Sequence, residues 1–262
     1  MRYFRCLIIL IAVAVADLLV GSGSAASIRP AAIALVRVPI LMYHHISDNS
    51  RWPNDDRKKR LTVQPDRLAE QLDYLQRAGY TTITLDDLAA ALRTGAPLPN
   101  KPVILTFDDG YQDFYTNAYP LLQRYGAKAT IYIISGWVGR PDIMTWDELR
   151  TLAASPLITI GAHTRTHPQL AKHSAERSWE ELAGSKADLE ARLHITVQHL
   201  AYPSGNYNKT TIKQSQQIGF VTATTVHYGV QERADKLFEL PRVFVNGGTP
   251  LEDLIVGLEG RR

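Results

Sequence analysis

The sequence predicts an α/β fold in which mainly parallel strands form a single-domain barrel. Apolar, strand-like segments alternate with amphipathic helical segments along the chain, a pattern typical of parallel sheets. Polar residues with catalytic chemistry directly follow two of the strand-like segments, as they do at the carboxyl ends of barrel strands. The chain after residue 26 holds 236 residues, which suits one large domain with a substantial core.

The first 26 residues predict a secretory signal peptide. Two arginines precede an apolar run over residues 7–16, and the small residues 24–26 form a cleavage site before Ser27. Asp17 interrupts the apolar stretch, so a retained transmembrane anchor is the less favoured alternative. We therefore expect an exported protein, periplasmic or extracellular and associated with the cell envelope, whose domain spans residues 27–262.

Eight short apolar segments predict the strands. They lie near residues 38–45, 81–84, 102–107, 127–134, 157–162, 197–202, 220–225 and 239–245. Helical periodicity is clearest over residues 65–78 and 174–193, and residues 251–258 predict a further amphipathic helix. The polar residues 49–60 predict a loop at the border of the site.

Two adjacent carboxylates end the strand-like segment at residues 102–107. Asp108 and Asp109 follow this segment directly, and Gly110 then allows a sharp turn. Such a pair can divide its work, with one acid holding a metal and the other acting as general base. An acidic turn is the alternative, but the acid pairs elsewhere, such as Asp86-Asp87, neither end an apolar strand nor precede glycine.

A pair of histidines follows the strand-like segment at residues 157–162. His163 and His167 are four residues apart and share a face if the backbone makes one helical turn. Two imidazoles and one carboxylate make a three-ligand set that leaves open positions for water and substrate, as catalytic metal sites do. A histidine pair that only forms loop hydrogen bonds is the alternative.

These motifs resemble those of the NodB-homology polysaccharide deacetylases, the metal-dependent carbohydrate esterases of family four. The first two motifs are similar to residues 106–110 and 163–167, and the third to residues 200–205. Residues 40–46 and 144–149 are similar to the branch that deacetylates poly-N-acetylglucosamine. The resemblance covers the chain from about Val38 to its end and implies a distorted (β/α) barrel of about seven strands.

The resemblance also implies roles for individual residues. Asp109, His163 and His167 would hold a divalent metal, most often Zn²⁺, and Asp108 would be the general base. The backbone N–H of Tyr202 would stabilise the oxyanion of the transition state. The substrate would be an N-acetylated polysaccharide, either an exopolysaccharide such as poly-β-1,6-N-acetylglucosamine or a cell-wall glycan, and acetate would be released.

The sequence departs from the family pattern at an arginine. The family's third motif carries an arginine that tethers the catalytic aspartate, and Gln198 stands in its place. Arg242 could supply this cation from another strand at the oxyanion and substrate side of the site. A solvated surface arginine is the equally weighted alternative.

A second departure concerns the general acid, because no histidine follows His227 in the C-terminal part where the family usually carries one. In the exopolysaccharide branch the corresponding motif lies at the N-terminal end of the domain, so His44 or His45 is the candidate. If Ile40 and Met42 face inward, strand alternation turns His44 inward as well. We therefore assign His44 as general acid, with His199 as the rival.

Two other functions stay open at this point. A barrel glycoside hydrolase would use paired carboxylates without a metal, but those acids should be about 5–9.5 Å apart and would rarely be adjacent residues. A catalytically weak glycan-binding relative is the second alternative, although the complete acid and histidine set argues against it.

The charge balance argues against nucleic-acid binding. The formal net charge is +3, and removing Arg2, Arg5 and Asp17 with the leader leaves +2. Residues 57–60 (Arg-Lys-Lys-Arg) form a locally basic run without interleaved aromatics, which we interpret as a solvated loop rather than a polymer- or lipid-binding segment. The sequence leaves peripheral membrane or envelope contact and the oligomeric state open.

Overall fold

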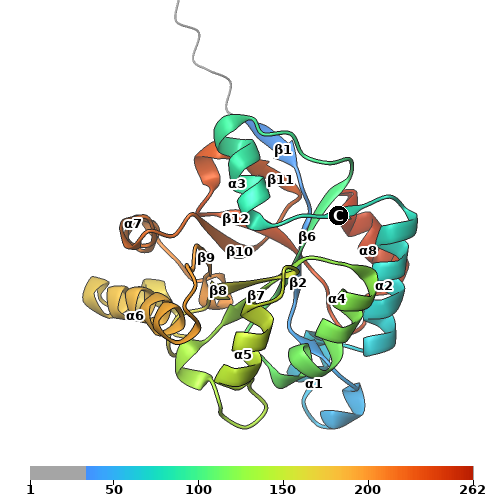
Figure 1. Cartoon of the computed structure of the whole chain (residues 1–262), viewed down its shortest axis with the longest axis horizontal. Helices are drawn as coiled ribbons and strands as arrows, with labels where there is room; N and C mark the ends of the chain where they lie inside the picture. Colours follow the sequence, from blue (N-terminus) through green and yellow to red (C-terminus); the bar gives the residue numbers. More distant parts are fainter. Residues whose placement is uncertain (1–33, 262) are drawn as a thin grey trace, which may run out of the picture. The chain divides into compact units, whose positions relative to one another are not determined.

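A parallel β-barrel surrounded by helices dominates the structure, a computed structural model that describes residues 34–261 (Figure 1). The expected signal peptide of residues 1–26 lies outside the described residues. Seven strands close the ring in the order β2-β12-β10-β9-β8-β7-β6, and β6 pairs back with β2. These strands are β2 (Ile40–Tyr43), β6 (Pro102–Phe107), β7 (Ala129–Ile133), β8 (Ile158–Ala162), β9 (His199–Ala201), β10 (Thr222–Tyr228) and β12 (Leu240–Phe244). The predicted barrel of about seven parallel strands is confirmed.

Short strands extend this barrel at its edges. β5 (Thr81–Thr82) pairs with the start of β6, and β3 (His45–Ile46) pairs with β4 (Thr62–Val63). β1 (Leu35–Arg37) and β11 (Gln231–Arg233) form a separate antiparallel ribbon. The segment predicted near residues 38–45 is therefore two strands, because the chain leaves the barrel at His44 and resumes pairing with β4.

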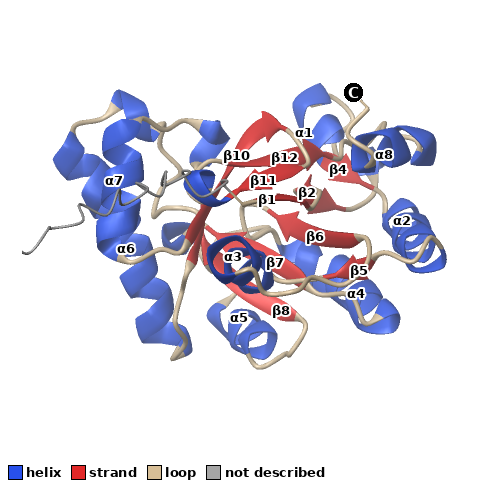
Figure 2. Ribbon diagram, turned by 90° about the horizontal axis from the view of Figure 1, so that it is seen from above, coloured by secondary structure: helices blue, strands red, loops and turns tan. Residues whose placement is uncertain are grey.

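Helices cover the outside of the barrel (Figure 2). They are α1 (Asp56–Leu61), α2 (Pro65–Arg77), α3 (Leu85–Thr94), α4 (Tyr119–Tyr125), α5 (Trp146–Ala153), α6 (Ala175–Leu193), α7 (Lys209–Ile218) and α8 (Leu251–Leu258). The predicted helices at residues 65–78, 174–193 and 251–258 are confirmed. None of the helices within residues 34–261 combines the length and apolar character needed to cross a membrane.

The expected loop at residues 49–60 contains an ordered helix instead. The basic run at residues 57–60 lies in α1, whose N-cap Asp55 accepts a hydrogen bond from the Lys58 N–H. A carboxylate cap and an acidic first turn stabilise a short helix that apolar periodicity does not reveal.

Strand alternation divides the core into two layers. Ile40, Ile104 and Leu240 belong to one buried cluster inside the barrel, together with leucines of α3. Their strand neighbours Leu41 and Leu105 belong to a second cluster between the barrel and the outer helices. Because the side-chain period of a strand is two, the inward face of each strand continues towards its carboxyl end. At that end polar side chains take the place of apolar ones.

Candidate active site

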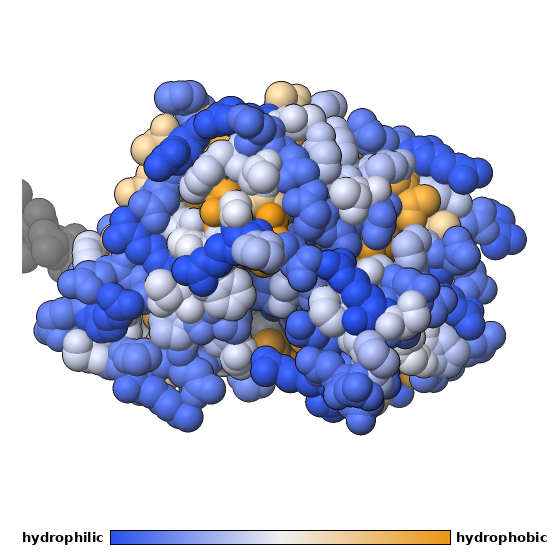
Figure 3. Space-filling view, turned by 90° about the horizontal axis from the view of Figure 1, so that it is seen from below, coloured by the Kyte–Doolittle hydropathy of each residue, from blue (hydrophilic) through white to orange (hydrophobic). Residues whose placement is uncertain are grey.

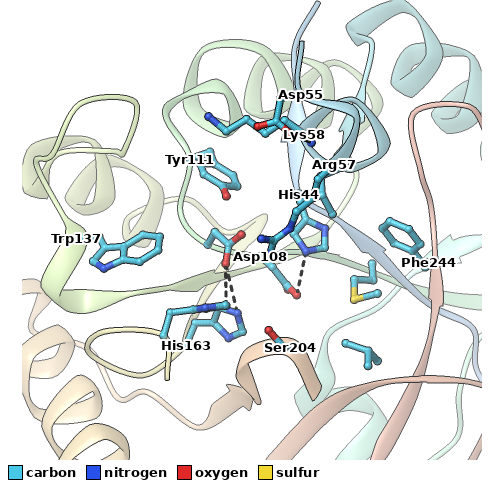
Figure 4. A pocket seen from close by; sticks show the side chains of 15 residues that line it. His44, Asp55, Arg57, Lys58, Asp108, Tyr111, Trp137, His163, Ser204 and Phe244 are labelled. Atoms are coloured by element: carbon cyan, nitrogen blue, oxygen red, sulfur yellow. Dashed lines mark hydrogen bonds and ion pairs between the residues drawn. The ribbon is translucent and has the colours of Figure 1, made fainter. Parts of the chain in front are cut away.

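A pocket of about 590 Å³ opens where the barrel strands end. Figure 3 looks onto one face of the molecule, where hydrophilic residues predominate and apolar ones show only in patches between them. The residues that line the pocket come from strand ends, from α1 and from the segments that follow β6, β7, β8 and β9. They are Met42, His44, Asp55, Arg57, Lys58, Leu61, Asp108, Asp109, Tyr111, Trp137, His163, His167, Ser204, Val226 and Phe244 (Figure 4).

Asp109, His163 and His167 come together as a three-ligand cluster. Oδ1 of Asp109 lies 3.4 Å from Nε2 of His163 and 3.5 Å from Nε2 of His167. Ligands about 2.0–2.2 Å from a tetrahedral metal are separated by roughly 3.4 Å, so these spacings fit a shared ion. The buried Oδ1 of Asp109 has no hydrogen-bond partner of good geometry among the described residues. The donor set therefore fits a divalent metal such as Zn²⁺.

The surroundings prepare this cluster to bind a cation. Nδ1 of His163 donates to the carbonyl oxygen of Ala201 at 2.7 Å, which leaves Nε2 without a proton and free to bind metal. Burial alone would raise the pKa of Asp109, but the neighbouring histidines lower it overall. Asp109 and His167 both have left-handed backbone conformations, with φ of 76° and 62°. Such uncommon backbone conformations concentrate at functional sites.

The loop between the two histidines is held by Glu181 of α6, whose side chain is 1% exposed. Its carboxylate accepts the backbone N–H groups of Arg165 and Thr166 at 2.9 and 2.8 Å and the Thr166 hydroxyl at 2.7 Å. Arg177 donates to the same carboxylate at 2.7 Å. Glu181 thus fixes the loop that places both imidazoles, a role that helical periodicity alone does not indicate.

Arg242 lies inside the barrel and is only 1% exposed, so the solvated alternative is wrong. Its guanidinium donates to both oxygens of Asp108 at 2.8 Å, and also to Oγ1 of Thr106 and the carbonyl oxygen of Thr225. Arg242 therefore supplies the tether to the aspartate that the family's third motif lacks here, as expected. It does not line the pocket, which corrects its placement on the oxyanion and substrate side. Burial alone raises the pKa of Asp108, but Arg242 lowers it overall, so Asp108 is ionised and able to accept a proton.

His44 reaches the pocket as strand alternation predicts. Its Nε2 lies 3.9 Å from Oδ2 of Asp108, and Phe244 packs edge-on against its ring. Burial lowers the pKa of His44, although Asp108 and Asp109 act in the opposite direction. Nδ1 of His45 instead donates to Asp113 at 2.7 Å, and the His45 ring stacks on Tyr111.

His199 lies at the start of β9 and does not line the pocket. Its Nδ1 contacts the Thr222 hydroxyl at 2.9 Å, and its Nε2 lies 3.2 Å from Asp86 of α3. The rival candidate for the general acid thus lies at the amino end of a barrel strand, whereas His44 and Asp108 lie at the carboxyl ends of theirs.

The oxyanion assignment to Tyr202 is wrong. Its backbone N–H donates to the carbonyl oxygen of Thr224 at 3.1 Å, continuing the pairing of β9 with β10, and its ring is buried. The next N–H in the chain belongs to Ser204, because Pro203 has none. Ser204 lines the pocket with a left-handed φ of 54°, and its N–H has no acceptor within residues 34–261. Pro203, two residues after the end of β9, is the sequence feature from which this free donor could have been predicted.

Aromatic side chains that the sequence analysis did not assign form much of the pocket wall. Tyr111 directly follows the acid pair and Gly110, and its hydroxyl is within hydrogen-bond reach of Asp109. Trp137 packs 5.9 Å from the ring of His167, centroid to centroid. Sugar rings present apolar faces that such side chains can stack against. The wall is therefore suited to a carbohydrate ligand.

Comparisons with known proteins agree with this geometry. A protein-family model described as polysaccharide deacetylase matches residues 95–223. A Bacillus subtilis protein named for the same activity is 32% identical over 212 residues, which cover 81% of this chain and 72% of the relative. The chain belongs to the polysaccharide deacetylase family. It is therefore an amide hydrolase by family, which argues against the glycoside hydrolase alternative. Measurement of acetate release decides the weak glycan-binding alternative.

Solved polysaccharide deacetylases share the fold. The Streptococcus pyogenes deacetylase PplD, solved with acetate, has a TM-score of 0.78 at 30% identity, covering 86% of this chain and 99% of that one. A Bacillus cereus polysaccharide deacetylase has a TM-score of 0.75 at 28% identity, covering 86% and 69%. The poly-β-1,6-N-acetyl-D-glucosamine N-deacetylase of Escherichia coli is 24% identical over 255 residues, and the match spans 81% of this chain but only 37% of that protein.

Proposed function

We propose that this polysaccharide deacetylase is a divalent-metal-dependent hydrolase that removes N-acetyl groups from an N-acetylglucosamine-containing polysaccharide and releases acetate. One observation carries the proposal: a carboxylate and two imidazoles at tetrahedral ligand spacing lie beside a second carboxylate in the same pocket. The relatives named as poly-β-1,6-N-acetyl-D-glucosamine N-deacetylases support an exopolysaccharide substrate, and a cell-wall glycan is the alternative.

Asp109, His163 and His167 would hold the metal, and the mixed nitrogen and oxygen donors favour Zn²⁺. When bound, this ion would polarise the acetamide carbonyl and make water more acidic. The pairing of Asp108 with Arg242 keeps the second carboxylate out of the ligand set and aims it at the pocket.

Two side chains and one backbone N–H of the protein would carry out the remaining steps. Asp108 would accept a proton from the attacking water, whose oxygen bonds to the acetyl carbon. The free N–H of Ser204 would donate to the oxygen that gains negative charge. His44 would deliver a proton to the nitrogen as the carbon–nitrogen bond breaks, because an amide anion is not a viable leaving group near neutral pH. Acetate and a free amine on the sugar result.

The proposal includes a location outside the cytoplasm. The charged start, the apolar run over residues 7–16 and the small residues 24–26 support export with cleavage before Ser27. N-terminal sequencing of protein recovered from the periplasm or medium should begin near Ser27. An intact Met1 on a membrane-bound product would support the anchor instead.

Acetate release from poly-β-1,6-N-acetylglucosamine, chitooligosaccharide and peptidoglycan tests the activity and ranks the substrates. We expect a chelator to abolish release and Zn²⁺ to restore it. Asp109→Ala and His163→Ala should each bind far less metal while retaining the circular dichroism of the wild type. His173→Ala is the matched control, since this exposed histidine lies outside the pocket. Full metal occupancy in both ligand variants would refute the assignment.

A further inference from the structure

Positively charged side chains without a carboxylate partner gather at the mouth of the pocket. Arg57 and Lys58 reach it from α1, and Figure 4 shows them on the side opposite His163. Arg140 lines an adjoining pocket of about 310 Å³ that shares three lining residues with the first. Within residues 34–261, none of these three cations forms an ion pair. We call them the cationic rim.

Neighbouring cations differ from the rim in having partners. Arg51 pairs with Asp142, and Lys59 pairs with Asp56. The only acid that lines the pocket at α1 is Asp55, and its carboxylate caps the helix by accepting the Lys58 N–H at 2.9 Å. The rim therefore retains a local excess of positive charge.

Aromatic rings hold two of the rim cations in place. Nζ of Lys58 lies 4.0 Å from the ring centroid of Trp52, and the guanidinium carbon of Arg140 lies 5.8 Å from that of Trp137. A cation–π contact orders a charged head without neutralising it. The rings thus hold Lys58 at the mouth and Arg140 in the adjoining pocket, and Arg57 is exposed at the mouth.

The acidic residues at the base of the pocket do not neutralise the charge of the cationic rim. Arg242 already pairs with Asp108 through two hydrogen bonds, and Asp109 faces the two histidines. A bound divalent ion would add further positive charge at the base. The rim charge is consequently available to whatever enters the pocket.

A neutral N-acetylated glycan has no charge for these cations to bind. Each deacetylation moreover leaves an amine, which takes up a proton near neutral pH and would be repelled by the rim. Resting on the proposed deacetylase function, we propose that the cationic rim selects glycans carrying an anionic group, a phosphate or a carboxylate, on a sugar adjoining the N-acetyl group that reacts.

Matched oligosaccharides test this specificity. The rate of acetate release, as kcat/KM, is measured with the Zn²⁺-loaded enzyme on an N-acetylglucosamine tetrasaccharide, on the same compound with a 6-phosphate, and on the same compound with a 6-carboxylate. We expect the anionic compounds to be preferred on the order of tenfold, because exposed ion pairs contribute a few-fold each. The preference should largely vanish in 1 M salt, where the screening length is about 3 Å.

Substitutions in the cationic rim provide a second test of the anion preference. The double variant Arg57→Gln, Lys58→Gln should lower the ratio of anionic to neutral kcat/KM several-fold. Lys213→Gln, an exposed lysine of α7 outside both pockets, should leave that ratio as in the wild type. Preference for the phosphate alone would identify a phosphorylated glycan, and equal preference for both anions would identify a general anion site.

Equal kcat/KM on neutral and anionic compounds would overturn the inference while leaving the deacetylase function intact. Acetate release from none of the compounds would instead contradict the deacetylase function itself. Vesicles containing phosphatidylglycerol supply the remaining comparison. Co-sedimentation of the wild type but not of the double variant, with no anion preference among the glycans, would overturn the inference and assign the rim to a lipid surface.

Discussion

Glu232 of β11 carries a buried carboxyl group that the fold leaves without a partner. Its side chain is 0% exposed, and neither carboxyl oxygen has a hydrogen bond within the described residues. Burial raises the pKa of Glu232 from 4.5 to about 9. The folded protein therefore keeps a proton here that the unfolded chain releases above about pH 4.5.

The sign of the effect follows from this difference in bound protons. Between about pH 4.5 and 9 the folded state holds more protons than the unfolded state, so the free energy of unfolding falls as the pH rises. Each pH unit is worth about 1.36 kcal/mol. At pH 7, which is 2.5 units above 4.5, Glu232 thus costs about 3 kcal/mol. This is a large fraction of the roughly 5–15 kcal/mol that stabilises a typical domain.

Glu232→Gln removes the ionisation and keeps the shape. We expect urea denaturation to show a free energy of unfolding about 3 kcal/mol higher than that of the wild type at pH 7, and nearly equal at pH 4.5. Glu252→Gln, which changes an exposed acid at the start of α8, is the control and should leave the pH dependence unchanged. Parallel wild-type and Glu232→Gln profiles would refute the reasoning and show that this carboxyl group is solvated.

Three further predictions concern the site. Asp108→Asn should retain metal and lose about 10²–10⁴ in kcat, because the amide keeps the shape but cannot accept the water proton; loss of metal with normal turnover per bound ion would exchange its role with that of Asp109. His44→Ala should lose about 10²–10⁴ in kcat at unchanged metal content, whereas His199→Asn should cost far less, and the reverse order would move the general acid to β9. Glu181→Gln should weaken Zn²⁺ binding about 10–100-fold, measured by metal titration, with activity recovering at high Zn²⁺; unchanged affinity would show that the loop holds itself.

The fold could be predicted from local patterns because each barrel strand is a short apolar run followed by polar chemistry. Alternation from Ile40 also placed His44 correctly on the inward face. The partner of Arg242 could not be predicted, since it depends on which strands meet when the ring closes. The free oxyanion donor was missed for a similar reason: the N–H of Tyr202 is occupied only because β9 pairs with β10, which leaves Ser204 as the donor.

The contact between Arg242 and Asp108 joins residues 134 positions apart. Arg242 belongs to β12, the last strand of the ring, which pairs with β2, the first. A partly folded or incomplete chain can therefore carry the three proposed metal ligands and still leave Asp108, the proposed general base, untethered. The proposed activity would therefore appear only after β12 has docked against β2 and closed the ring.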